Sequence, residues 1–207
     1  SPEYLVLSTV MSVFQKLKKT EIVLNDLGLF QNLINSLDLP RRWKLRLIRH
    51  RSRKEYFNEL LRRLDTNYDL DNDKIKIDYD RLAELKKIDQ NKIIGGRIVE
   101  DIIERFEKKL KDPRDNFRGS YSAKIIKDFL KLKAPLSKST QKLKTFLQKN
   151  NLKIKDLDQS LAKLINLQSK FGSKYTINFD TQFGIETQYY TGIAFSVYKQ
   201  KKELARG

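Results

Sequence analysis

Cysteine is absent from this sequence, and histidine occurs once, at position 50. The lack of cysteine excludes disulfides and thiolate metal sites, and a single histidine excludes a metal site built on a histidine pair. His50 lies in the basic run Arg49-His50-Arg51, which is typical of a solvated helix end rather than of a Ser-His-Asp hydrolase. We therefore expect neither a metal centre nor a cofactor nor a histidine-based nucleophile.

Long apolar runs are also missing. No stretch reaches the roughly 18 apolar residues that a membrane-spanning helix needs, and the first residues do not resemble a signal peptide. A chain of 207 residues with 39% hydrophobic content can bury a sizeable core, as one domain or as two lobes. These features predict a cytoplasmic protein with no membrane association.

Basic residues are in large excess, with 43 Lys and Arg against 26 acids and a net charge of +17. Nucleic-acid binding requires such residues to cluster on one face, and one dense block does occur, within 41–54. The other lysines stand between acids, as in 104–109, where they are typical of solvated helix faces with i,i+4 pairing. The pattern therefore favours ordinary solvated surfaces over nucleic-acid binding.

Apolar periodicity predicts a mainly helical chain with strands near both ends. The helices expected are 2–18, 28–37, one or two within 41–64 that break near Arg51-Ser52, and then 80–85, 98–110, 121–132, 139–149 and 157–171. The strands expected are 21–24, 175–180 and the run that ends at Tyr198. Ser52 is a suitable N-cap for the helix after the break, and residues 65–73 have the composition of a surface loop. Gly95-Gly96 precedes a helix without the spacing of a nucleotide loop, so a turn is favoured there over a phosphate site.

The run from Tyr189 to Tyr198 combines two patterns. Ile193, Phe195 and Val197 alternate with their neighbours, as in a half-buried strand, and this pattern alone accounts for most of the run. The run opens with the sequence Tyr-Tyr-Thr-Gly, in which an aromatic pair, a hydroxyl and a glycine could form the floor of a small-molecule site. Both interpretations stay open from the pattern alone.

Tyr-Tyr-Thr-Gly before a hydrophobic strand resembles the histidine-pocket motif of histidyl-tRNA synthetases and of their non-catalytic relative, the regulatory subunit of ATP phosphoribosyltransferase. Asn25-Asp26-Leu27-Gly28-Leu29-Phe30 and Gly95-Gly96-Arg97 resemble the regulatory subunit as it occurs in alphaproteobacteria. The resemblance implies an α+β fold, part of the antiparallel-sheet core of a class II aminoacyl-tRNA synthetase with a large helical insertion. It assigns residues 1–64 to the first part of the core, 65–172 to the insertion and 173–207 to the return to the sheet, all within an internal portion of a longer chain.

One departure separates the two relatives. In the synthetases an Arg-Gly-Leu-Asp sequence precedes the tyrosines, and its arginine helps to activate the carboxylate of histidine. This chain has Ile185, Glu186, Thr187 and Gln188 there, and an isoleucine cannot neutralise the charge that develops when a carboxylate attacks ATP. We therefore expect no aminoacylation and no catalysis by this chain.

The resemblance thus implies a regulatory subunit that is required for the first step of histidine biosynthesis and mediates histidine feedback. Its implied partners are a short-form catalytic ATP phosphoribosyltransferase subunit, which is a glycosyltransferase, and a second synthetase-like core in a homodimer. Histidine would be the effector, held by Tyr189, Tyr190, Thr191 and Gly192, with Gln182 and Glu186 near enough in sequence to line the pocket. The alternative is a histidyl-tRNA synthetase-like fragment that binds histidine, tRNA or both.

Overall fold

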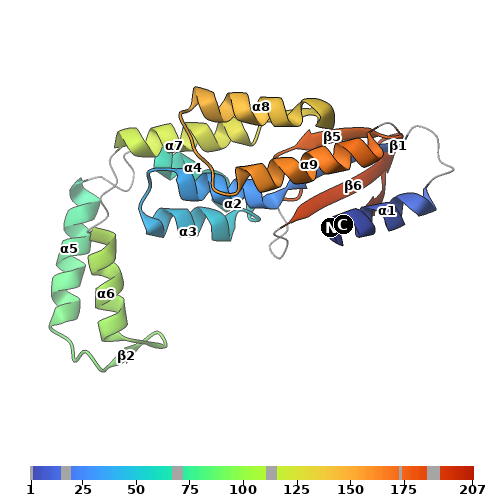
Figure 1. Ribbon diagram of the computed structural model, residues 1–207. Coiled ribbons are helices and arrows are strands. Elements are labelled where there is room, and N and C mark those ends of the chain that lie inside the picture. The colour runs from blue at the N-terminus through green and yellow to red at the C-terminus, as the bar shows by residue number, and fades with distance from the viewer. Residues whose placement is uncertain (1, 15–19, 67–71, 111–115, 173, 186–191) are drawn as a thin grey trace.

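A computed structural model describes residues 2–14, 20–66, 72–110, 116–172, 174–185 and 192–207 (Figure 1). The helices are α1 (Pro2–Val13), α2 (Leu27–Ser36), α3 (Arg41–His50), α4 (Lys54–Asp65), α5 (Asn72–Lys86), α6 (Val99–Leu110), α7 (Asn116–Phe129), α8 (Leu136–Lys149) and α9 (Leu157–Phe171). The strands are β1 (Thr20–Asp26), β2 (Ile93–Ile94), β3 (Arg97–Ile98), β4 (Lys133–Pro135), β5 (Thr176–Asp180), β6 (Ile193–Lys199) and β7 (Lys202–Arg206). A sheet with many helices confirms the predicted α+β class.

The main sheet has the strand order β4-β5-β1-β6-β7. β1 runs parallel to β5 and antiparallel to β6, and the two outer pairings, β4 with β5 and β6 with β7, are also antiparallel. The parallel pair is possible because the long, mostly helical segment between β1 and β5 carries the chain back to the starting edge of the sheet. Consequently β1 and β5 end, and β6 begins, along the same side of the sheet. This side, formed by strand ends, is the sheet edge and is distinct from the edge strands β4 and β7.

The main hydrophobic core joins the sheet to most of the helices. Ile22 and Leu24 of β1 are fully buried, and the same cluster contains Trp43 of α3 and Phe129 of α7. α9 contacts both α2 and α8, and α4 contacts α7. Figure 1 shows these helices gathered beside the sheet, and α1 lies near β6.

α5 and α6 form a hairpin that projects from the rest of the molecule (Figure 1). They pack around a small separate cluster of Leu82, Val99 and Ile103. The two-stranded β2–β3 ribbon lies at the end of the hairpin, and its turn residues Gly95 and Gly96 have φ of +58° and +76°. Positive φ at both central residues is typical of a type I′ turn, which is the reason for two glycines here.

Several predicted helices and strands are present in the structure but begin or end at residues other than those predicted. α9 matches its prediction, whereas α1 is described as a helix only to Val13, and residues 15–18 of the predicted helix lie outside the described part. The break near Arg51-Ser52 is confirmed, but the predicted N-cap at Ser52 is wrong. α4 begins at Lys54, and its N-cap is Arg53, whose carbonyl accepts the first helical bond from the Phe57 amide at 2.7 Å.

The edge strands β4 and β7 were not predicted. Pro135 in β4 argues against a strand because it cannot donate to a ladder, yet β4 lies at the edge, where that donor is not needed. β4 pairs with β5, and α9 packs on α2, so parts of 65–172 share the main sheet and core. The boundaries 1–64, 65–172 and 173–207 stay predictions.

Candidate functional site

In sequence, the predicted histidine-binding residues fall between β5 and the first residues of β6. Of these residues the structure describes Gln182 and Gly192, while Tyr189, Tyr190, Thr191 and Glu186 lie outside the described residues. The β1–β6 register places Asn25 opposite Ala194 and Asp26 opposite Ile193. The start of β6 therefore lies beside the end of β1, at the sheet edge.

The N-terminus of α2 also lies at this edge. Asp26 is the N-cap of the helix, and its side chain accepts a bond from the Gly28 amide at 3.0 Å. The amide of Leu27 donates to the carbonyl of Gly192 at 3.0 Å. These two bonds explain the sequence Asn-Asp-Leu-Gly, because aspartate caps the helix while the first helical amide holds the chain that enters β6.

Asn25 fixes the turn that follows β5. Its Nδ2 donates to the carbonyls of Thr181 at 3.0 Å and Phe183 at 2.9 Å, and the residue is 1% exposed. The two carbonyl acceptors settle which side-chain atom is nitrogen. Its Oδ1 is buried, and among the described residues it has no hydrogen-bond partner.

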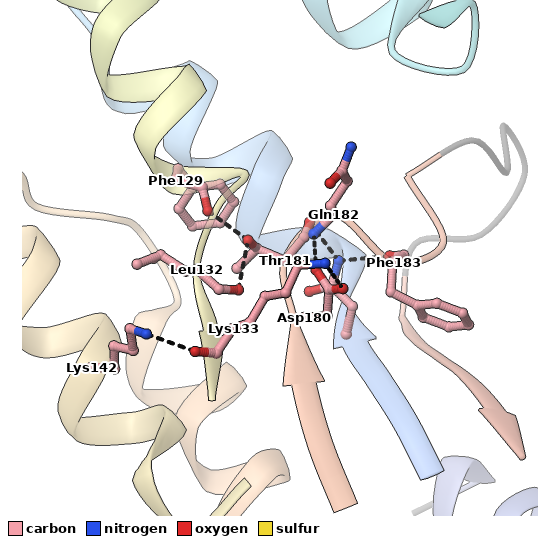
Figure 2. Close-up of polar contacts among 9 residues, drawn as sticks. Phe129, Leu132, Lys133, Lys142, Asp180, Thr181, Gln182 and Phe183 are labelled. Atoms are coloured by element: carbon pink, nitrogen blue, oxygen red, sulfur yellow. Dashed lines mark hydrogen bonds and ion pairs between the residues drawn. The ribbon is translucent and has the colours of Figure 1, made fainter. Parts of the chain in front are cut away.

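Thr181 anchors the other side of the same turn, as Figure 2 shows. Its hydroxyl donates to the carbonyl of Phe129 at 2.5 Å, and its amide donates to that of Leu132 at 3.1 Å. Beside it, Asp180 pairs with Lys133 at 2.9 Å. The end of β5 is therefore tied both to β1 and to the segment that joins α7 to β4.

Gln182 and Ile185 lie differently within this turn. Gln182 is exposed, and its side chain points away from the hydrogen bonds drawn in Figure 2. Ile185 is 7% exposed and belongs to the main core. The residue at the position of the synthetase arginine thus packs as an apolar core residue, and Gln182 does not line a described cavity.

Two features of the structure, one at this site and one elsewhere, were not predicted as functional from the sequence. Asn25 lies in the run 20–26, where a buried amide at the end of an apolar strand is the signal that could have marked it. The second is a cavity between α3 and the α5–α6 hairpin, where part of the basic block meets basic residues of α6. Periodicity could not show that these two helices approach each other.

In the described part of the chain no three His, Cys, Asp or Glu residues are grouped to hold a metal ion. Within the same residues, no helix is long and apolar enough to cross a membrane.

Comparison with known proteins gives one similar sequence. An ATP phosphoribosyltransferase regulatory subunit from Allorhizobium ampelinum is 26% identical over 188 residues, which cover 85% of this chain and 50% of that protein. The chain therefore spans half the length of the relative it matches. No family model matches the sequence.

A similar solved structure is described as an ATP phosphoribosyltransferase regulatory subunit/histidyl-tRNA synthetase from Bacillus halodurans. The identity is 14% and the TM-score 0.47, with 93% of this chain and 38% of that chain covered. A TM-score at this level carries no argument about function.

Proposed function

We propose that this chain is part of a non-catalytic regulatory subunit of ATP phosphoribosyltransferase that mediates histidine feedback in histidine biosynthesis. The observation that carries the proposal is the similarity to the regulatory subunit, which extends over 85% of the chain. The proposal also includes pairing of synthetase-like cores into homodimers, assembly with a short-form catalytic subunit and a cytoplasmic location. Catalysis resides in that partner.

The geometry of the sheet edge supports a regulatory rather than an aminoacylating role. Ile185 packs in the core, so the position that carries an arginine in the synthetases supplies no positive charge for a reacting carboxylate. Hydrogen bonds at Asn25, Thr181 and Gly192 tie together the end of β1, the turn after β5 and the start of β6. A ligand held there could bias an assembly, provided that it binds two states with different affinity.

In this proposal the hydroxyl of Tyr190 hydrogen-bonds the imidazole of histidine, and Tyr189, Thr191 and Gly192 shape the floor of the pocket. The buried Oδ1 of Asn25 offers an acceptor at the base of the same edge.

Replacing Tyr190 by phenylalanine tests the pocket. With the full-length parent protein and its catalytic subunit, we expect the histidine concentration for half-inhibition to rise about tenfold, because one hydrogen bond to a polar ligand is lost. Inhibition is measured relative to the uninhibited rate of the same variant. Calorimetric titration of histidine into each variant gives the affinity directly.

Tyr198→Phe is the matched control, since it removes the same hydroxyl from a β6 residue outside the proposed pocket. Histidine inhibition should be the same in this variant as in the natural protein. Equal inhibition in both variants would place the histidine pocket elsewhere, and no activation of a catalytic subunit by the parent protein would reject the regulatory role itself.

A further inference from the structure

A cavity of about 750 Å³ lies between α3 and the α5–α6 hairpin, and no residue of the sheet edge lines it. From α3 it receives Arg42, Arg46 and Arg49, all on one side of the helix at i, i+4 and i+7 spacing. From α6 it receives Arg105, Lys108 and Lys109. Two helices more than fifty residues apart in sequence therefore turn basic faces toward one space.

The positive charge of this cavity is poorly compensated. Of the described residues, eight Lys and Arg and a single carboxylate, Asp78, line the cavity. Asp78 is already paired with Lys109, and Lys108 pairs with Glu104 at 2.5 Å. Among the described residues, Arg49, Arg81, Arg97 and Arg105 form no ion pair.

His50 lies in the same wall of the cavity. Burial lowers the pKa of His50, and the charges of Arg53, Arg49 and Arg46 lower it further. His50 is therefore neutral at physiological pH and donates or accepts a hydrogen bond without adding charge. Like charges gathered at one place raise the free energy of the folded protein unless an anion joins them.

The volume of the cavity is that of a small-molecule site. It falls within the roughly 300–1,000 Å³ of such pockets, and the cations of its lining come from four elements, α3, α5, β3 and α6. Guanidinium groups bind phosphate oxygens through two parallel hydrogen bonds. Phe106 and Ile102 add an apolar portion to the lining.

We propose that this cavity binds a small anion that carries two or more linked phosphates. Arg49 and Arg105 hold the phosphates from opposite walls, and Arg81 and Arg97 complete the cation set. The proposal stands on the cavity alone, so it is independent of the histidine pocket and of the regulatory role.

The test is calorimetric titration of inorganic tripolyphosphate into the full chain. We expect saturable binding with one site per chain, and a loss of about a hundredfold in affinity in the double variant Arg49→Gln/Arg105→Gln, because each charge-assisted contact contributes about tenfold. The matched control is Lys124→Gln/Lys138→Gln, which removes the same charge from exposed positions on α7 and α8 and should keep the natural affinity. Trp43 fluorescence checks that each variant is folded.

A third variant separates a fitted site from general attraction. Arg49→Lys/Arg105→Lys keeps the charge and loses the two-bond geometry, so its affinity should lie between those of the natural chain and the glutamine variant. No binding of tripolyphosphate would overturn the proposal, and so would equal losses in the cavity and control variants.

Two further titrations identify the source of the phosphates. If the ligand is a nucleotide, ATP binds more tightly than tripolyphosphate, and Phe106→Leu removes that advantage without changing tripolyphosphate binding. If the ligand is a free polyphosphate, ATP and tripolyphosphate bind with the same affinity in the natural chain and in Phe106→Leu. A short RNA hairpin is titrated as well. If it binds the cavity and tripolyphosphate fails to displace it, the ligand is RNA and the proposal is overturned.

Discussion

At the scale of single residues, the candidate site depends on a few side chains that hold the turn after β5. Asn25 donates hydrogen bonds to two carbonyls of this turn, and Gly184 allows the turn to pass close to β6. Gly184 has φ of +71°, and a Cβ there would lie 2.8 Å from the Cβ of Ala194. The glycine is therefore required both by the backbone conformation and by the lack of space.

We predict that Gly184→Ala lowers the free energy of unfolding by about 2–4 kcal/mol, from about 1–2 for positive φ and the rest from overpacking. Urea unfolding followed by Trp43 fluorescence measures the change. The double variant Gly184→Ala/Ala194→Gly removes the clash and keeps the unfavourable φ, so it should be more stable than the sum of the two single changes implies. Strict additivity would mean that φ alone accounts for the loss.

At the scale of elements, much of the fold could be predicted from sequence and some of it could not. α9 and β5 carry strong apolar periodicity, which is why their predicted ranges were nearly right. β4 was not predicted because it is three residues long and ends in Pro135. Its strand state comes from pairing with β5 and not from any local pattern.

The candidate site stays a prediction at Tyr189, Tyr190 and Thr191, which lie outside the described residues. The structure brings Gly192, the last residue of that sequence, to the end of β1 through the bond with Leu27. Burial of Ile185 in the core and of the Asn25 side chain depends on contacts between segments about 160 residues apart, which no local pattern contains. The same holds for the cavity between α3 and α6.

The junction of α4 and α7 contains a pH-dependent contact. Asp65 accepts hydrogen bonds from Lys127 and Ser120, each at 2.8 Å, and these bonds, first that of Lys127, lower the pKa of the Asp65 carboxyl below its ordinary 3.8. A lowered carboxyl pKa stabilises the fold above the ordinary value, and the stabilisation is lost as the pH falls from 3.8 through the folded-state pKa.

We predict that Asp65→Asn reduces the free energy of unfolding by less than about 1 kcal/mol at pH 6, because the pair is exposed to solvent. The difference from the natural protein should shrink as the pH falls from 3.8 through the folded-state pKa, because protonation leaves both proteins with a neutral side chain at position 65. Urea unfolding at several pH values measures it. Asp128→Asn is the control on α7, since its pair with Lys131 is exposed and 3.8 Å long. A difference for Asp65→Asn that does not change with pH would contradict the assignment.

At the scale of the whole molecule, the protein has two cores of very unequal size. The main cluster joins the sheet to α1–α4 and α7–α9, and Trp43 is fully buried in it. The α5–α6 hairpin has a cluster of three buried hydrophobic residues of its own and projects from the rest (Figure 1). A small separate cluster supports less stability than a large one, so the hairpin should open at a lower free energy than the main body.

The two cores predict two transitions in urea. Far-UV circular dichroism, which reports all helices, should lose part of its signal before the fluorescence of Trp43, the single tryptophan, changes. Val99→Ala should enlarge the early phase, because it removes about 1–2 kcal/mol of buried apolar contact from the hairpin, and it should leave the Trp43 transition in place. Val197→Ala, an equally buried valine of β6, should instead shift the Trp43 transition. Coincident transitions by both probes in all three proteins would show that the hairpin and the main body unfold as one unit, in which case the walls of the basic cavity are held together by the global stability of the fold.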